Sequence, residues 1–344
     1  MTALPKRRIA STDVEVSVLG LGGAPLGNLF DVIPEDRALA TVEAAHAAGY
    51  GWFETAPFYG HGVSEHRFGH VLRGEPRESF LLSTKTGRML RAARGPVESP
   101  FKGEHAFEII HDYTYDATMR SIEDSLQRLG MSRIDIALIH DVDPMHQGSG
   151  YEDRFAEAST GACRALDALK SQGVLGAWGI GVNEVGPCLR FGRDTGLDCV
   201  MLARSYTLLE QTGVPELLDL ATAMDFSLLI AGPFGSGILA SGSGNAATHN
   251  YAPPAPDVLD RVRHIETVCR EHDVPLRAAA LQFPLGHLRV AAVAAGAVIP
   301  DQAADNAALM TRAIPDAFWD ALRAAGMIGP DVTTPKAGSS GADR

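Results

Sequence analysis

The chain has 344 residues, of which 45% are apolar and 21% are charged, and its formal net charge is −12. This composition is typical of a water-soluble globular protein with a large core, and it excludes disordered and collagen-like classes. The acidic balance repels nucleic-acid phosphates and anionic membrane surfaces, so we expect neither as a partner. No run of about 18 apolar residues occurs and the amino terminus lacks a signal-peptide core, which together predict a cytoplasmic protein.

Metal and disulfide frameworks are not indicated. The four cysteines show no CxxC pairing, and they lie inside segments that read as helix or strand. They are Cys163, Cys188, Cys199 and Cys269. His66 and His70 have a spacing that could chelate a metal, but the chain has no HExxH motif. We therefore expect free thiols, no metal, and a reducing compartment. The sequence gives no indication of oligomeric state.

Short apolar runs alternate with helical segments along the chain, which is typical of a parallel sheet with crossover helices. A hairpin over Arg7 to Val16, turning at Ser11-Thr12-Asp13, is expected to precede them. The predicted strands are Val18 to Gly22, Gly51 to Thr55, Phe80 to Lys85, Ile134 to His140, Ala177 to Val182, Cys199 to Ala203, Phe226 to Ala231 and Val290 to Val298. The amphipathic helices include Glu35 to Ala48, Tyr115 to Leu129, Gly161 to Gln172, Val214 to Met224 and Leu276 to Leu285. Eight such units predict an α/β fold, a (β/α)8 TIM barrel with an N-terminal β-hairpin and a C-terminal extra helix.

Three segments stand outside this repeat. Gly87 to Asp112 is far longer than an ordinary βα connection, so we interpret it as a functional loop and a candidate lid over a substrate. Ser241 to Pro256 is rich in Gly, Ser, Ala and Pro, which predicts a flexible loop. Residues 7–330 are expected to form a single domain, and residues 331–344 a disordered tail without apolar periodicity.

Polar residues that close apolar strands are the first candidates for chemistry, because a barrel gathers its reactive groups at the C-terminal ends of its strands. Glu54 lies at the end of the second strand and Tyr59 follows it, Lys85 closes the third, His140 closes the fourth, and Asn183 follows the fifth. Each has an ordinary alternative as a salt-bridge partner, loop aromatic or strand cap. Together they predict one proton-transfer cluster.

The residue types in this cluster suit hydride transfer coupled to proton transfer. A phenol has an ordinary pKa of about 10, and a neighbouring cation such as Lys85 stabilises its phenolate and makes it an effective base. The carboxylate of Glu54 can hold that ammonium group in place. The imidazole of His140 can orient a carbonyl or hydroxyl group.

The motifs WFETAPFYGHGVSE, LLSTKTGR and RLGMSRIDIALIHD resemble those of the aldo-keto reductase superfamily, over about residues 7 to 327. The segments WGIGVNE and GPFGSGILA are similar to its branch of aldose 1-dehydrogenases and pyridoxal 4-dehydrogenases. The resemblance implies Tyr59 as the acid or base, Lys85 as its modulator, His140 as the substrate orienter and Asn183 as a donor to the nicotinamide. Glu54 stands where the family usually has aspartate, so the reach toward Lys85 differs.

The resemblance also places the cofactor after the seventh and eighth strands. It implies binding by Tyr206, Gly232, Pro233, Phe234, Gly235, Ser236, Gly237, Gly296, Gln302, Asp305 and Asn306. Glycines there let backbone N–H groups approach a pyrophosphate. Val298, Ile299 and Gln302 occupy the positions of the usual NADP phosphate clamp, and Arg312 is the nearest basic residue in sequence. We therefore expect NAD as the cofactor, with NADP as the alternative.

These observations predict NAD-dependent oxidation of a cyclic hemiacetal to a lactone. The substrate would be a small molecule, either an aldose such as L-fucose, L-galactose or D-arabinose, or pyridoxal. Phe58, Trp52 and His140 are the candidate substrate contacts. The first alternative is an NADPH-dependent aldehyde or ketone reductase. The second, of another class, is a non-catalytic nucleotide-binding regulatory subunit.

Overall fold

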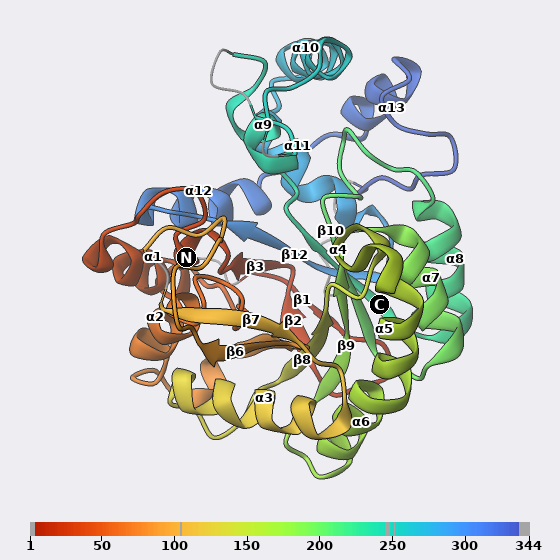
Figure 1. Ribbon diagram of the computed structural model, residues 1–344. Coiled ribbons are helices and arrows are strands. Elements are labelled where there is room, and N and C mark those ends of the chain that lie inside the picture. The colour runs from red at the N-terminus through yellow and green to blue at the C-terminus, as the bar shows by residue number, and fades with distance from the viewer. Residues whose placement is uncertain (1–3, 104, 245–247, 251, 337–344) are drawn as a thin grey trace.

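Eight parallel strands form a closed barrel in the computed structural model, which describes residues 4–103, 105–244, 248–250 and 252–336 (Figure 1). The strands are β3 (Leu19–Gly22), β4 (Trp52–Glu54), β5 (Leu81–Thr86), β8 (Ile136–His140), β9 (Ala177–Val182), β10 (Cys199–Ala203), β11 (Ser227–Ala231) and β12 (Val290–Gly296). They adjoin in chain order, and β12 pairs with β3 to close the ring. Their side chains are almost all buried, as expected for strands covered on both faces. The predicted barrel is confirmed.

Helices connect consecutive strands around the outside of the barrel (Figure 1). The helices between consecutive barrel strands are α1 (Glu35–Ala47), α2 (Val63–Leu72), α3 (Tyr115–Leu129), α6 (Cys163–Ser171), α7 (Val185–Asp194), α8 (Val214–Met224) and α11 (Leu276–Gln282). A further helix, α12 (Pro300–Met310), follows the last strand, β12. Additional helices are α4 (Pro144–Gln147), α5 (Tyr151–Glu157), α9 (Ile238–Ser241), α10 (Pro256–Glu271) and α13 (Asp316–Ala324). The last of these is the predicted C-terminal extra helix.

An antiparallel hairpin of β1 (Lys6–Arg8) and β2 (Glu15–Ser17) precedes the barrel, as predicted. Its apolar residues Ile9, Val14 and Val16 form one buried cluster with inward-facing barrel side chains. Arg7 donates to the carbonyl oxygen of Val290, at the start of β12, over 2.7 Å. The hairpin therefore covers the N-terminal ends of the strands and leaves the opposite end of the barrel for ligands.

The long segment after β5 differs from the prediction of an irregular loop. It contains an antiparallel hairpin, β6 (Arg88–Ala92) paired with β7 (Phe107–His111). Each strand is only five residues long and neither alternates apolar with polar residues, so neither stands out in a Gly- and Pro-rich context. This hairpin projects from the C-terminal end of the barrel (Figure 1).

Two predicted irregular segments are only partly described. Within Ser241 to Pro256, a bridge pairs His249 with Ala252, while residues 245–247 and 251 lie outside the described residues. Of the predicted disordered tail, residues 337–344 also lie outside them, and Val332 is buried. No helix in the described ranges is long and apolar enough to cross a membrane.

Candidate active site

Four of the predicted residues meet at the C-terminal end of the barrel. Lys85 Nζ donates a hydrogen bond to Tyr59 Oη over 2.8 Å and also donates to the carboxylate of Glu54. Tyr59 Oη lies 3.4 Å from the same carboxylate oxygen. The rings of Tyr59 and His140 are edge-to-face with centroids 5.9 Å apart. The structure thus brings a phenol, a buried ammonium, a carboxylate and an imidazole into one cluster.

Lys85 reaches this cluster from the interior of the barrel and is 2% exposed. Its aliphatic stem runs beside Gly181 of β9, where an added Cβ would lie 3.3 Å from Lys85 Cε. Glu54 is also buried, at 3% exposure, so each charge depends on the other for compensation. The longer side chain at this position still reaches the ammonium group, and the departure from the family's aspartate leaves the ion pair intact.

His140 is held as a neutral imidazole. Burial lowers its pKa well below the ordinary value of 6.5, and the charges of Lys85 and Arg88 lower it further. Its Nε2 lies 3.3 Å from a carboxylate oxygen of Asp141, whereas its buried Nδ1 has no hydrogen-bond partner among the described residues. A neutral imidazole can orient a bound oxygen.

Asn183 lies beside this cluster, directly after β9. Its side-chain amide donates to Asp141 over 3.1 Å and accepts from Arg204 over 3.0 Å. Arg204 follows β10 and takes a left-handed conformation with a φ of 63°. The amide proposed to face the nicotinamide is therefore already fixed by two neighbours.

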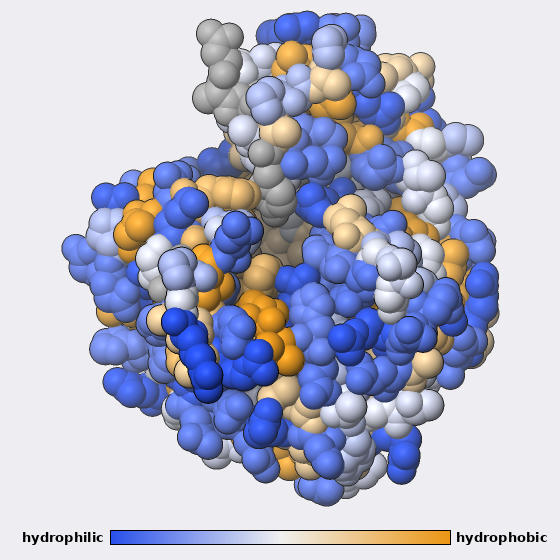
Figure 2. Space-filling model, in the orientation of Figure 1, coloured by the Kyte–Doolittle hydropathy of each residue, from blue (hydrophilic) through white to orange (hydrophobic). Residues whose placement is uncertain are grey.

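An aromatic wall of Phe58, Phe101 and His61 adjoins Tyr59. The Phe58 and Phe101 rings are edge-to-face at 5.1 Å, and Phe58 also stacks on His61 at 6.2 Å. Phe101 belongs to the segment between β6 and β7 and is 2% exposed. Figure 2 shows a hollow on this face between the β6–β7 hairpin and the region of α9 and α10, with hydrophobic residues at its side.

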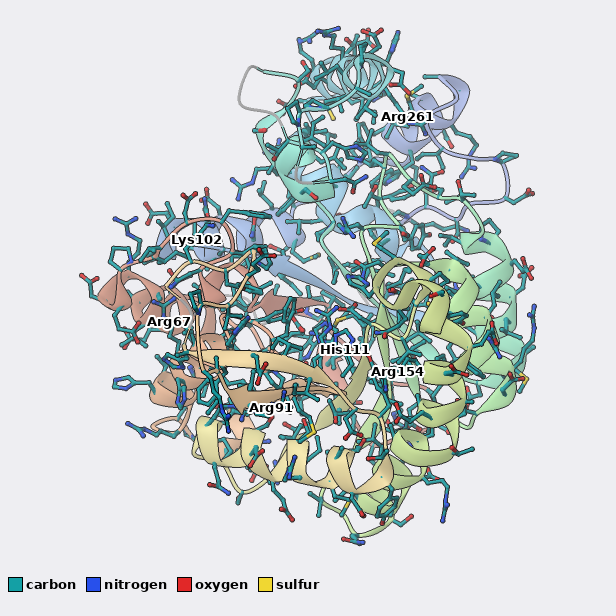
Figure 3. All side chains as sticks on the ribbon, viewed as in Figure 1. Arg67, Arg91, Lys102, His111, Arg154 and Arg261 are labelled. Atoms are coloured by element: carbon teal, nitrogen blue, oxygen red, sulfur yellow. The ribbon has the colours of Figure 1, made fainter. Side chains whose placement is uncertain are left out.

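Charged and titratable side chains of the segment that contains the β6–β7 hairpin lie at different distances from the middle of this face. In Figure 3, His111 lies toward the middle of the face, whereas Arg91 and Lys102 lie farther out. Arg91 pairs with Glu108 at the surface over 2.7 Å. His111 is half-buried and its pKa is lowered by burial and by the charge of Arg88. The inner side of the hairpin therefore contributes to the site and the outer side does not.

The Gly-rich segment after β11 has the backbone expected of an anion-binding loop. Gly232, Gly235, Ser236 and Gly237 all have positive φ angles, from 56° to 112°. A non-glycine residue in this conformation is uncommon, and the buried Oγ of Ser236 has no hydrogen-bond partner among the described residues. These features fit a bound pyrophosphate. Pro233 and Phe234 form the turn between these residues.

The second predicted cofactor segment runs from Gly296, the last residue of β12, into α12. Gln302 accepts from the backbone N–H of Val298 over 2.9 Å and so braces the turn. Arg277 of α11 contacts both Asn306, at 2.7 Å, and Asp305, at 3.4 Å.

The basic residue closest to this segment was therefore misjudged from sequence. Arg312 bonds to Asp273 at the far end of α12, so it is not the cation to consider. Arg277 was missed because it is 28 residues away from Asp305 in the chain, and no local pattern connects the two positions.

Two residues predicted to contact ligands are buried in the core: Trp52, a predicted substrate contact, and Tyr206, a predicted cofactor contact. Trp52 is 0% exposed, donates from Nε1 to Ser83 and packs with the N-terminal hairpin residues, below the reactive cluster. Tyr206 is also 0% exposed and packs against Phe283 at 5.4 Å. Both are core residues, because a large aromatic side chain is as easily placed in a core as in a ligand slot.

Arg88 and Asp141 belong to the site but were not predicted. Arg88 bonds to Asp141 over 2.9 Å and lies over the Phe58 ring at 4.2 Å. Each residue follows a predicted catalytic residue closely in sequence, Lys85 and His140 respectively. That adjacency was the only available signal.

Asp141, Asp143 and His146 bring possible metal-ligand atoms within 4.8 Å of one another. These atoms already bond within the protein, however. Asp143 accepts from the His146 ring over 2.7 Å and from the backbone N–H of Asn183 over 3.1 Å. The group therefore carries no metal assignment.

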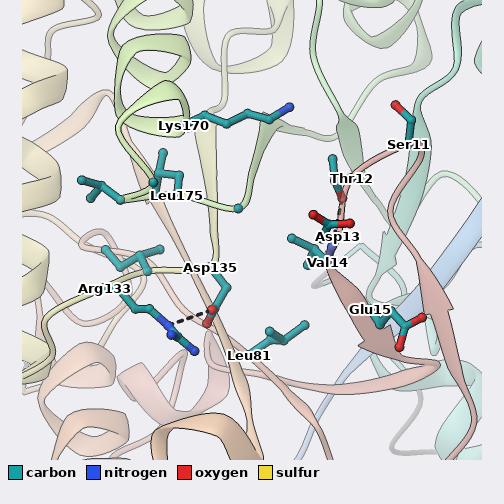
Figure 4. Close-up of a pocket in the computed structure, with 14 residues that line it drawn as sticks. Ser11, Thr12, Asp13, Val14, Glu15, Leu81, Arg133, Asp135, Lys170 and Leu175 are labelled. Carbon is teal, nitrogen blue, oxygen red and sulfur yellow. Dashed lines mark hydrogen bonds and ion pairs between the residues drawn. The ribbon is translucent and has the colours of Figure 1, made fainter.

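A pocket of about 580 Å³ lies at the opposite, N-terminal end of the barrel (Figure 4). It is lined by the turn of the hairpin and by Asp135, Arg133 and Lys170. Arg133 and Lys170 are engaged in ion pairs with Asp135 and Asp198. This pocket is remote from Tyr59, and the described residues that line it include neither a tyrosine nor a histidine.

The chain matches the model of the Aldo/keto reductase family over residues 18–326. It is 37% identical to a pyridoxal 4-dehydrogenase of Microbacterium luteolum, covering 95% of this chain and 99% of that protein. It is 36% identical to a D-threo-aldose 1-dehydrogenase of a Pseudomonas species, covering 93% and 97%.

Among solved structures, the fold is similar to that of an aldo-keto reductase from Bacillus halodurans in its holo form. The TM-score is 0.73 at 23% identity, covering 98% of this chain and 99% of that one. The family model, the two relatives and the barrel fold all indicate the same family. The chain therefore belongs to the Aldo/keto reductase family and is a nicotinamide-dependent oxidoreductase that acts on CH–OH groups of small-molecule substrates.

Proposed function

We propose that this protein oxidises the anomeric hydroxyl group of a cyclic hemiacetal to a lactone, with NAD as the oxidant. The observation that carries the proposal is the 2.8 Å hydrogen bond from Lys85 to Tyr59 beside His140. It places an ammonium group, which favours the ionised form of a phenol, against the Tyr59 oxygen and next to a neutral imidazole, and this arrangement suits removal of a proton from a positioned hydroxyl group.

In the proposed reaction, both the proton and the hydride that leave the substrate have an acceptor. Tyr59 Oη accepts the hydroxyl proton, His140 orients the substrate, and the C–H bond of the same carbon breaks as the C=O bond forms. A nicotinamide cofactor held beside Asn183 would supply the acceptor for the departing hydride. Lys85 stabilises the negative charge on the tyrosine oxygen, and Glu54 keeps the ammonium group directed toward it.

The aromatic wall favours pyridoxal over an aldose as the hemiacetal. A pyridine ring needs a flat apolar surface with a few polar anchors, whereas a sugar needs many converging polar groups. Phe58, which is partly exposed, supplies such a surface next to Tyr59, and the buried Phe101 ring packs against it and supports it. The 37% identity to a pyridoxal 4-dehydrogenase supports the same choice. Aldoses are the second candidates, supported by the D-threo-aldose 1-dehydrogenase at 36% identity.

We propose NAD rather than NADP because, within the described part of the chain, no uncompensated cation contacts the segment expected to hold the adenosine ribose. Arg277 is the basic residue in contact with this segment, and it is already engaged by Asp305 and Asn306. A 2′-phosphate would add close to two negative charges beside Asp305.

Both parts of the proposal are tested by one panel of assays. NADH formation is measured with pyridoxal, L-fucose, L-galactose and D-arabinose, and each product is identified by mass spectrometry as lactone or not. We expect lactone from pyridoxal at the highest kcat/KM, and at least about tenfold lower kcat/KM with NADP. No turnover of any hemiacetal would refute the substrate class, and equal kcat/KM for the two cofactors would refute the NAD preference.

A further inference from the structure

Asp141 occupies an unusual place directly after His140. It takes a left-handed backbone conformation with a φ of 52°, and its carboxylate is buried at 5% exposure. One carboxylate oxygen, Oδ2, lies 2.9 Å from Arg88 and 3.3 Å from Nε2 of His140. The other, Oδ1, accepts from the Asn183 amide over 3.1 Å. A single carboxylate thus touches the substrate side and the cofactor side of the site.

Arg88 favours the ionised form of Asp141. Burial raises the pKa of Asp141, and the Arg88 guanidinium opposes this by favouring the ionised form. Arg88 is itself buried at 5% exposure and is fixed from its other side by the Phe58 ring. A buried ion pair of this kind contributes little net stability compared with apolar side chains, so its role is better sought in the groups that it orients.

The orientation of His140 has a chemical consequence because the ring is neutral. A neutral imidazole carries one proton, so one nitrogen donates and the other accepts. A carboxylate beside Nε2 stabilises the proton on Nε2. The buried Nδ1 has no hydrogen-bond partner among the described residues, so a proton on Nδ1 would be left unpaired, which favours the same tautomer.

We propose that Asp141, held by Arg88, is a positioning residue that fixes the tautomer of His140 and the amide of Asn183 together. This inference rests on the proposed oxidation at Tyr59. It assigns roles to two residues that act through His140 and Asn183. Substrate orientation and nicotinamide placement are then set by one carboxylate, and its loss weakens both.

The test is Asp141→Asn, with Asp135→Asn as the matched control. Asp135 is a buried carboxylate just before the same strand, paired with Arg77 over 2.6 Å at the opposite end of the barrel. For Asp141→Asn we expect kcat to fall about tenfold to a hundredfold and KM for NAD to rise. The ring-nitrogen NMR shifts of His140, assigned by comparison with His140→Gln, are expected to move toward the Nδ1–H tautomer. The control keeps the wild-type kinetics and shifts.

Arg88→Gln serves as the second variant if Asp141→Asn does not fold, with changes expected in the same direction. Unchanged His140 shifts in a folded variant would overturn the inference, as would equal kinetic losses in Asp135→Asn. If the wild-type protein oxidises no hemiacetal, the proposed function fails on its own. The NMR comparison still tests the positioning role in that case.

Discussion

At the scale of single residues, the site depends on two buried charges that compensate each other. Lys85 and Glu54 are both almost inaccessible to water, at 2% and 3% exposure. Removing one partner of such a pair leaves an unpaired charge in a medium of low dielectric constant, which is far more costly than losing a surface pair.

Glu54→Gln is therefore expected to lower the free energy of unfolding by about 3–5 kcal/mol, measured by urea denaturation. Glu108→Gln is the matched control, because Glu108 also pairs with an arginine, Arg91, over 2.7 Å, but both side chains are exposed, at 41% and 65%. The control is expected to lose no more than about 1 kcal/mol. Equal losses in the two variants would show that Glu54 does not compensate a buried charge.

The buried His140 is expected to make the free energy of unfolding depend on pH. Its folded-state pKa lies well below the ordinary value, so on acidification below about 6.5 the unfolded chain binds a proton that the folded chain does not. Stability then falls as the pH decreases, by up to about 1.4 kcal/mol per pH unit for this group. His140→Gln is expected to reduce that slope, whereas His264→Gln, at an exposed position, leaves it unchanged. The same slope in all three proteins would contradict a buried neutral His140.

At the scale of elements, the barrel strands and the long segment after β5, which contains the β6–β7 hairpin, supply different residues of the site. The strands place Glu54, Lys85 and His140, and their near-continuous apolar sequences made them predictable within two residues at each end. The long segment supplies Arg88 and Phe101 from a hairpin whose pairing depends on contacts with distant segments. Phe30 N–H, for example, donates to the Pro100 carbonyl, and Leu29 bridges to Phe101. Such contacts leave no periodic signal in the sequence.

Phe101→Ala tests whether this hairpin segment shapes the substrate site. The ring packs on Phe58 and Tyr59, so we expect KM for the hemiacetal to rise about tenfold while KM for NAD changes little. Phe107→Ala on the same hairpin is the control, because that ring contacts His105 and only the backbone carbonyl of Phe107 reaches His61. A rise in both variants would indicate general disorder of the hairpin instead of a specific contact.

At the scale of the whole molecule, the fold and the central cluster could be predicted from sequence, whereas its surroundings could not. The alternation of strand and helix patterns in the sequence predicts the barrel. The geometry of a barrel then brings the ends of β4, β5 and β8 together. Trp52 was misplaced because sequence does not show which way a strand residue faces at a given depth of the barrel. Arg277 and Asp141 act through partners distant in sequence, Asp305 and Arg88, which only the closed fold brings within reach.

The whole barrel serves to place one proton acceptor beside a hydride-accepting cofactor, and Tyr59→Phe tests that claim most directly. The variant keeps the ring and its contacts with Phe101 but removes the oxygen that accepts from Lys85. We expect kcat for hemiacetal oxidation to fall at least about a hundredfold, while the NAD dissociation constant, measured by fluorescence titration, stays the same. A Tyr59→Phe protein that binds NAD normally and oxidises its substrate at the wild-type rate would contradict the account.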